Sequence, residues 1–137
     1  MGTNNRNVLT VDASVSAMES IQSFVGDLLE KCDCPMKAQY QISVVIDEIY
    51  ANIASYSGAS QAEVAFDFDE GSRTVTLTFT DDGKPYNPLE AKEPDTSLSA
   101  DERPIGGLGI FIVRKTMDEV DYEYREGKNV LTLKKAV

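Results

Sequence analysis

The chain has 137 residues, of which 42% are hydrophobic and 26% charged, and this composition predicts one globular domain over residues 1–137. A formal net charge of −10 makes nucleic acid and anionic membranes poor partners, and the absence of histidine excludes Ser-His-Asp catalysis and the usual zinc sites. No apolar run is long enough to span a membrane and no signal peptide is evident, so we expect a cytoplasmic protein with reduced Cys32 and Cys34.

The first part of the chain predicts a strand and two helices. Residues 7–11 have the character of a short strand, and apolar side chains recur at helical spacing over residues 14–31 and again over residues 36–56. Pro35 separates the two helices, and the segment 57–60 ends the second.

The rest of the chain predicts two hairpins separated by a loop and a helix. Residues 62–69 and 73–80 alternate between polar and apolar side chains across a turn, which is typical of paired antiparallel strands. Residues 84–105 show no period and hold four of the five prolines, and long loops of this kind are usually functional or mobile. A helix over residues 107–117 and strands at 120–124 and 130–134 complete an α+β two-layer sandwich. We expect about three helices on one face of a mixed, mostly antiparallel five-stranded sheet.

The second helix carries a carboxylate and an amide on one side. At about 100° per residue, Glu48 and Asn52 differ by only about 40° and stand one turn apart, whereas Asp47 points roughly 140° away from Asn52. An amide oxygen suits Mg²⁺, and a neighbouring carboxylate can accept a proton from an attacking hydroxyl. The alternative is that both are ordinary polar residues at the margin of a helix.

The sequence Asp81-Asp82-Gly83 follows an alternating strand. A hairpin turn is the simple interpretation of Asp-Gly, but the segment 84–88 contains two prolines and cannot return as a paired strand. A carboxylate at such a strand end can accept a hydrogen bond from an exocyclic amine, and Gly83 permits close approach of a ligand.

A glycine-rich turn opens the third helix. The backbone N–H groups of Gly106, Gly107, Leu108 and Gly109 could bind phosphate there, because the start of a helix has unpaired donors and a positive dipole end. The pattern is neither a Walker P-loop nor a Rossmann fingerprint. A flexible hinge or tight helix packing is the alternative, and Arg103 could either reach a terminal phosphate or be solvated.

Together these segments resemble the GHKL (Bergerat-fold) ATPase superfamily, with the closest similarity to the bacterial anti-sigma-factor serine/threonine kinase branch. Glu48 and Asn52 are similar to its N box, Asp81 and Gly83 to its G1 box, and residues 107–109 to its G2 box. The strings Asp-x-Gly-x-Pro-Tyr-Asn-Pro and Arg-Pro-Ile-Gly-Gly-Leu-Gly-Ile are characteristic of that branch.

The resemblance implies a kinase that transfers the γ-phosphate of ATP to a serine of a STAS-domain anti-sigma-factor antagonist, and that otherwise holds a sigma factor. It implies that Asn52 binds Mg²⁺, that Glu48 is the base and that Asp81 contacts adenine. The glycines of residues 106–109 would support the phosphates under a mobile lid at about 84–105, and homodimers are common in the branch. Two alternatives stay open: a catalytically weak ATP-binding module that sequesters a sigma factor or other partner, and a catalytic domain of a larger sensor kinase.

Overall fold

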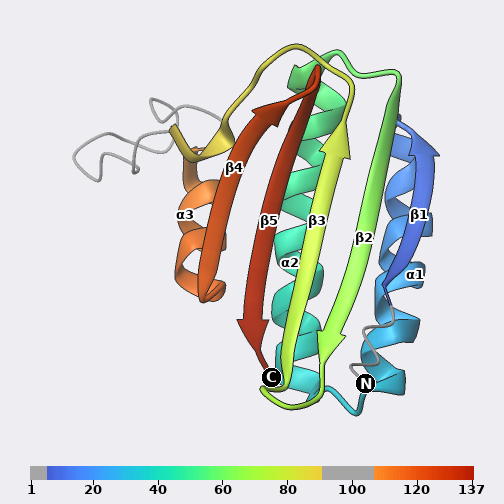
Figure 1. Ribbon diagram of the computed structural model, residues 1–137, viewed down its shortest axis with the longest axis vertical. Helices are drawn as coiled ribbons and strands as arrows, with labels where there is room; N and C mark the ends of the chain where they lie inside the picture. The colour runs from blue at the N-terminus through green and yellow to red at the C-terminus, as the bar shows by residue number, and fades with distance from the viewer. Residues whose placement is uncertain (1–5, 91–106) are drawn as a thin grey trace.

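A computed structural model describes residues 6–90 and 107–137, and its centre is a five-stranded sheet (Figure 1). The strand order is β1-β2-β3-β5-β4, and every pairing between these strands is antiparallel. The α+β sandwich is therefore confirmed, although the expected mixed sheet contains no parallel pair among the described strands. The strands are β1 (Asn7–Asp12), β2 (Gln61–Asp69), β3 (Thr74–Asp81), β4 (Glu119–Arg125) and β5 (Lys128–Ala136).

Three helices cover one face of this sheet: α1 (Met18–Lys31), α2 (Met36–Asn52) and α3 (Gly107–Thr116). In Figure 1 they all lie behind the sheet, and none of the helices in residues 6–90 and 107–137 lies on the other face. Two short 3₁₀ turns, η1 (Val15–Ala17) and η3 (Pro88–Glu90), lie before α1 and after β3. Among the described residues, none of these helices combines the length and apolar character required to cross a membrane.

The second helix ends earlier than predicted. Its α-helical part stops at Asn52, and the chain continues as one π-helical stretch, η2 (Ile53–Ser57), before Gly58 adopts a left-handed conformation with φ 67°. The apolar period alone predicts an unbroken helix to residue 56, because it does not register a change of hydrogen-bonding pattern. Short π-helical stretches in helices are rare and frequently mark functional sites.

The core lies between α2 and the central strands. On β3 the odd-numbered residues Val75, Leu77 and Phe79 are buried against the helices, and the even-numbered threonines face the open side. The same alternation on β5 buries Leu131 and Leu133. Because side chains alternate strictly along a strand, the inward position after Phe79 is Asp81.

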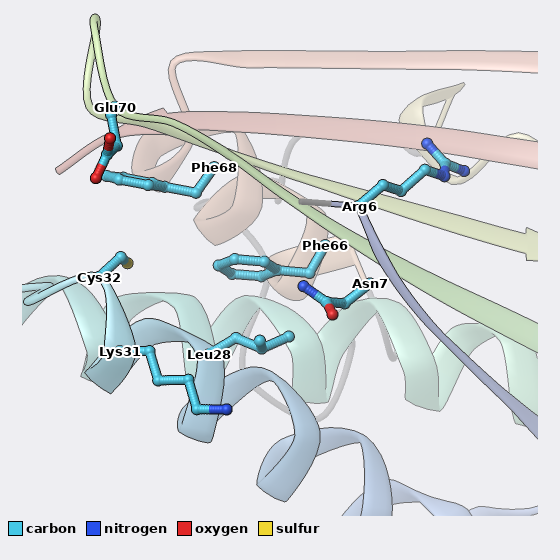
Figure 2. Close-up of a pocket in the computed structure, with 8 residues that line it drawn as sticks. All are labelled: Arg6, Asn7, Leu28, Lys31, Cys32, Phe66, Phe68 and Glu70. Atoms are coloured by element: carbon cyan, nitrogen blue, oxygen red, sulfur yellow. The ribbon is translucent and has the colours of Figure 1, made fainter. Parts of the chain in front are cut away.

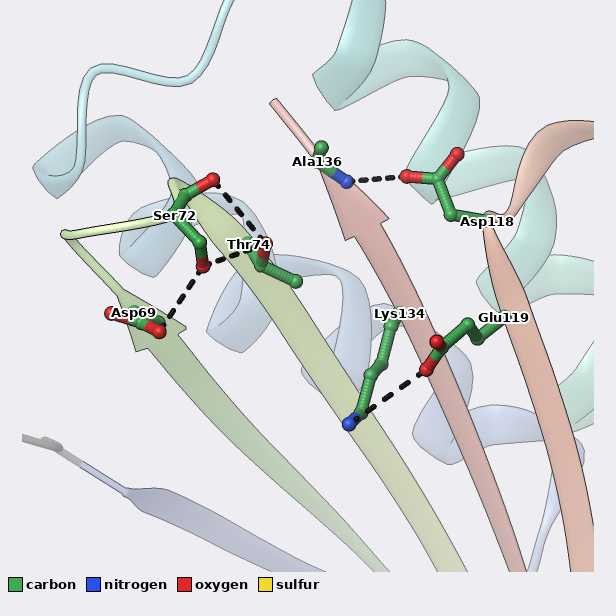
Figure 3. A network of polar contacts seen from close by, with 7 residues as sticks. All are labelled: Asp69, Ser72, Thr74, Asp118, Glu119, Lys134 and Ala136. Carbon is green, nitrogen blue, oxygen red and sulfur yellow. Dashed lines mark hydrogen bonds and ion pairs between the residues drawn. The ribbon is translucent and has the colours of Figure 1, made fainter.

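At the end of the sheet where β2 turns into β3, polar contacts join the turn and the ends of the strands (Figure 3). The Asp69 carboxylate accepts hydrogen bonds from the Ser72 hydroxyl (3.1 Å) and the Gly71 N–H (3.0 Å). The Asp118 carboxylate accepts one from the N–H of Ala136 at 2.7 Å. These contacts pair the strand termini at this end.

Arg73, in the same turn, joins three parts of the chain. It has a positive φ of 48°, and its guanidinium donates to the carbonyl of Cys32 (3.0 Å) after α1 and to that of Val137 (3.3 Å). Its own carbonyl accepts from the N–H of Val137 at 2.8 Å. The C-terminal residue is thus fixed beside the β2–β3 turn.

Candidate functional site

Asp81 is a buried carboxylate at the opposite end of the sheet. It is the last residue of β3, points toward the helices and is only 4% exposed. Its Oδ1 accepts hydrogen bonds from the Gly83 N–H at 2.9 Å and from the Asn129 side-chain amide at 3.0 Å. Both contacts use one oxygen, so within the described part of the chain Oδ2 remains available to accept from a ligand.

Asn129 is the cross-strand partner of Asp81 and organises this end of the sheet. Its Nδ2 donates to Asp81 Oδ1 (3.0 Å) and to the Lys84 carbonyl (2.8 Å). Its Oδ1 accepts from the Tyr86 N–H (2.9 Å) and from the Tyr122 hydroxyl. The side chain thereby uses both donors and both acceptor sites, and it fixes the chain just after β3 against the sheet.

The sequence analysis missed Asn129, although a signal was present. The inward positions of β5 run Asn129, Leu131 and Leu133, so an amide occupies a place where alternation requires an apolar residue. A buried polar group must find partners. Only the pairing of β3 with β5 reveals that its partner is Asp81.

Asn52 presents a second buried amide to the same place. It is the last residue of α2, is 8% exposed, and makes no side-chain hydrogen bond within the described residues. It lines a cavity of about 20 Å³ together with Asp81, Tyr86, Pro88 and Tyr122. A buried amide without a partner carries a desolvation cost that a ligand can relieve.

The cavity between Asn52 and Asp81 has room for about one water molecule and not for a purine. Tyr86, in the irregular chain after β3, and Pro88, the first residue of η3, form part of its wall. A base would need more room at this wall than the structure shows.

Glu48 lies one turn before Asn52 on α2, and it faces α3. The side chain is half-buried, and its Oε2 lies only 1.9 Å from the position that a Cβ at Gly109 would occupy. Asp47 is exposed and faces α1, where its Oδ1 accepts from the Gln22 side-chain amide at 3.1 Å. Glu48, and not its neighbour, is therefore on the side of α2 that meets the start of α3.

The glycine-rich segment is described in part. Gly107, Leu108 and Gly109 are the first three residues of α3, as expected for a loop-to-helix transition. Arg103 and Gly106, together with most of the predicted lid, lie outside the described residues. The structure thus brings Glu48, Asn52, Asp81, Gly83 and Gly109 to the ends of α2, β3 and α3.

No group of three or more Cys, Asp or Glu side chains among the described residues could hold a metal ion by itself. Mg²⁺ does not need such a group, since it keeps several waters and binds through one or two protein ligands plus substrate phosphates. The Asn52 amide oxygen, which has no hydrogen-bond partner in the part of the chain that the structure describes, fits that requirement.

Asp82 has a different task from Asp81. It is exposed, and its carboxylate accepts from the Ser60 hydroxyl (2.6 Å), the Ser60 N–H (2.8 Å) and the Gln61 N–H (3.1 Å). The hydrogen bond from the Ser60 hydroxyl, followed by the two backbone bonds, lowers the pKa of Asp82 to about 2. Asp82 therefore ties the start of β2 to the chain leaving β3.

Larger clefts lie elsewhere, and three that are lined by described residues contain none of the motif residues. One of about 390 Å³ lies between the end of α1 and β2, where the rings of Phe66 and Phe68 face Leu28 and Cys32 (Figure 2). It is open to solvent, and its size alone does not make it a reaction site.

Comparisons with known proteins identify the family of the chain and relatives with similar sequences. The family model described as the histidine kinase-like ATPase domain matches residues 11–135. The serine/threonine-protein kinase BtrW of Bordetella bronchiseptica is 29% identical over 99 residues, covering 71% of this chain and 70% of that protein.

A solved structure has the same fold. The crystal structure of the RsbU and RsbW domains of Rv1364c from Mycobacterium tuberculosis superposes with a TM-score of 0.67 at 15% identity. The match covers 95% of this chain but only 32% of the solved chain, so the protein described here spans about a third of that relative's length.

Proposed function

Because the chain belongs to the family of histidine kinase-like ATPase domains, we propose that it is an ATP-dependent serine/threonine protein kinase that acts as an anti-sigma factor. Its protein substrate would be a serine of a STAS-domain anti-sigma-factor antagonist, and its second partner a sigma factor. We further propose that it works as a homodimer. The similarity to a protein named as a serine/threonine kinase supports the reaction type.

The observation that carries this proposal is the pair of buried polar groups at one cavity. Asn52 is a buried amide without a hydrogen bond, and Asp81 keeps one carboxylate oxygen unused within the described residues. One group suits a cation bound to phosphates, and the other suits the exocyclic amine of adenine. A buried amide and a free carboxylate oxygen, of complementary chemistry and side by side within the described residues, support a nucleotide better than a purely structural role.

Each residue has a role in the proposed reaction. Asp81 accepts from the adenine amine, with Gly83 allowing close approach, and the N–H groups of residues 106–109, together with Arg103, support the phosphates. Asn52 would hold Mg²⁺, which when bound neutralises charge on the β- and γ-phosphates.

Phosphoryl transfer then requires one proton acceptor. The serine hydroxyl oxygen forms a bond to the γ-phosphorus while the bond from that phosphorus to the bridging oxygen breaks, and ADP leaves with the electron pair. The hydroxyl proton passes to the Glu48 carboxylate, one helical turn from Asn52. Asp47 cannot take this part, because it faces α1.

The test is transfer from γ-labelled Mg·ATP to purified STAS-domain proteins, with the labelled residue identified by mass spectrometry. Wild type should label a serine, and Glu48→Gln should bind Mg·ATP normally but transfer at least about a hundredfold more slowly, as expected for loss of a general base. Asp47→Asn is the matched control and should transfer at the wild-type rate.

Two results would contradict the proposal. Full transfer by Glu48→Gln would remove Glu48 from the reaction. Normal Mg·ATP binding by wild type without transfer to any STAS-domain protein would instead favour the ATP-binding module that only sequesters its partner.

A further inference from the structure

Gly109 is the third residue of α3, it is buried, and it leaves no room for a side chain. A Cβ at this position would lie 1.9 Å from Glu48 Oε2, 2.7 Å from Glu48 Cδ and 3.3 Å from Glu48 Cγ. The first two separations are shorter than any real contact between a Cβ and another heavy atom. With any other residue at 109, the Glu48 carboxylate could not stay where it is.

The backbone does not explain this glycine. The described glycines with positive φ are Gly58 and Gly127, so Gly109 has a conformation open to other residues. Glycine also weakens a helix relative to alanine. Its only evident advantage here is the missing side chain.

We propose that Gly109 is a positioning residue for Glu48, an inference that rests on the proposed function. Because Gly109 has no side chain, the Glu48 carboxylate can lie against α3. In that orientation it can take the serine proton. A methyl group at residue 109 would turn the carboxylate away from the reacting atoms. This role is separate from any contact between the backbone of α3 and phosphate.

Displacing the carboxylate should cost the fold little. The overlapping atoms are the far end of a flexible side chain, and Glu48 is half-buried, so it can rotate toward solvent. Alanine is also the better helix former. Gly109→Ala should therefore melt at the wild-type temperature or above it.

Gly26 provides a matched control. It lies inside α1, and a Cβ added there meets no atom within 4 Å. Gly26→Ala thus makes the same chemical change in a helix but touches no carboxylate.

The first experiment follows the side-chain carboxyl ¹³C resonance of Glu48, assigned by its loss in Glu48→Gln. Gly109→Ala should move this resonance, and Gly26→Ala should leave it in place. This measurement needs no turnover, so an unmoved resonance in Gly109→Ala overturns the inference whatever the protein's activity.

The second experiment measures turnover of Mg·ATP with water as the acceptor. The water oxygen bonds to the γ-phosphorus, ADP leaves with the bridging oxygen, and the proton passes to Glu48. Gly109→Ala should lower the rate tenfold or more while the Kd for Mg·ATP stays within about twofold, since only the transition state uses the carboxylate. Gly109→Ala should have no further effect in a Glu48→Gln background, because residues that act through one another are not additive.

The outcomes separate this inference from the proposed function. A rate loss in Glu48→Gln without one in Gly109→Ala would overturn the positioning role alone. A moved resonance with full activity in Glu48→Gln would establish the contact but remove the base, and with it the proposed reaction. A rate loss from Gly109→Ala that persists unchanged in the Glu48→Gln background would assign Gly109 to phosphate binding instead.

Discussion

The pairing of Asp81 with Asn129 shows how single residues shape this site. Both side chains are 4% exposed, and their hydrogen bond of 3.0 Å joins the end of β3 to the start of β5. The amide occupies one carboxylate oxygen, and the orientation of Asp81 is fixed before any ligand arrives. A preorganised acceptor of this kind favours a ligand that offers an amino group.

Asn129→Asp tests that pairing with almost no change in shape. The substitution would bring a second carboxylate to about the same 3.0 Å from Asp81 Oδ1 and remove the donor to the Lys84 carbonyl. Two carboxylates this close cannot both be ionised, and the folded protein would hold a shared proton more tightly than the unfolded chain does. The variant should therefore be less stable than wild type by about 3 kcal/mol at pH 8, with a smaller deficit at pH 5.

Urea unfolding at the two pH values measures this difference. Exchanging the groups, Asp81→Asn together with Asn129→Asp, restores one amide and one carboxylate and should recover part of the stability. Equal deficits at pH 5 and pH 8 would show that the two side chains do not interact as described.

At the residue scale, the sequence indicated where the candidate residues lie better than it indicated the side chains around them. Glu48, Asn52 and Asp81 were identified from helical and strand periodicity. Asn129 depends on a pairing between β3 and β5 that no local pattern encodes. The hydrogen bond that the Tyr122 hydroxyl donates to Asn129 also depends on strand pairing, so no local pattern in the sequence predicts it.

At the scale of elements, the Asp82 side chain connects β2 to the chain that follows β3. It accepts two hydrogen bonds from Ser60, which precedes β2, and one from Gln61, the first residue of β2. The lowered pKa of about 2 means that the folded protein holds this carboxylate ionised to lower pH than the unfolded chain does. The resulting stabilisation is complete above about pH 4 and is lost as the pH falls toward 2.

Asp82→Asn should therefore lower the melting temperature most above pH 4, and the gap from wild type should narrow between pH 4 and pH 2. Circular dichroism melts across that range measure it. Ser60→Ala removes the largest cause of the shift and should reduce the same pH dependence. A gap that stayed constant down to pH 2 would contradict this role of Asp82.

Helix α2 shows where prediction from periodicity stops. The isoleucines at 42, 46 and 49 face the core as predicted. Tyr50 lies off that stripe, yet it is fully buried, and its hydroxyl donates to the carbonyls of Ser14 (2.6 Å) and Asp12 (3.1 Å). Burial, and secondarily the charge of Asp12, raises the pKa of Tyr50. An amphipathic pattern assumes one buried face, whereas this helix buries a second one against the chain between β1 and α1.

For the whole molecule, nucleotide binding should appear as added stability. At about 100 times Kd, a ligand adds about 2.7 kcal/mol to the free energy of unfolding. For a domain of this size that corresponds to a rise on the order of 10 °C in melting temperature. We expect this rise with Mg·ATP, and we expect Asn52→Ala to lose its Mg²⁺-dependent part.

Melting with ATP plus chelator isolates the contribution of Mg²⁺. Gln41→Ala, on the same helix but outside the cavity, is the matched control and should keep the full rise. Equal shifts with and without Mg²⁺ in the wild type would contradict the assignment of Asn52.

The fold as a whole was predictable because its local patterns agree with one another. Alternation on β2 and β3, the helical period of α1 and the hairpin turns each specify one arrangement. The arrangement of the site was less predictable than the fold, because the narrow cavity depends on how Tyr86 and Pro88 pack after the chain leaves β3. That segment has no period and so carries no local pattern from which to predict its packing.

The hydrogen bonds between Arg73 and Val137 have a practical consequence. Val137 lies beside the β2–β3 turn, at the end of the sheet away from Asp81 (Figure 1). The eight residues of β3 separate these ends by roughly 24 Å. A biotin or surface linker joined behind Val137 would therefore immobilise the domain with its cavity directed into solution, where nucleotide and large protein analytes can reach it unobstructed.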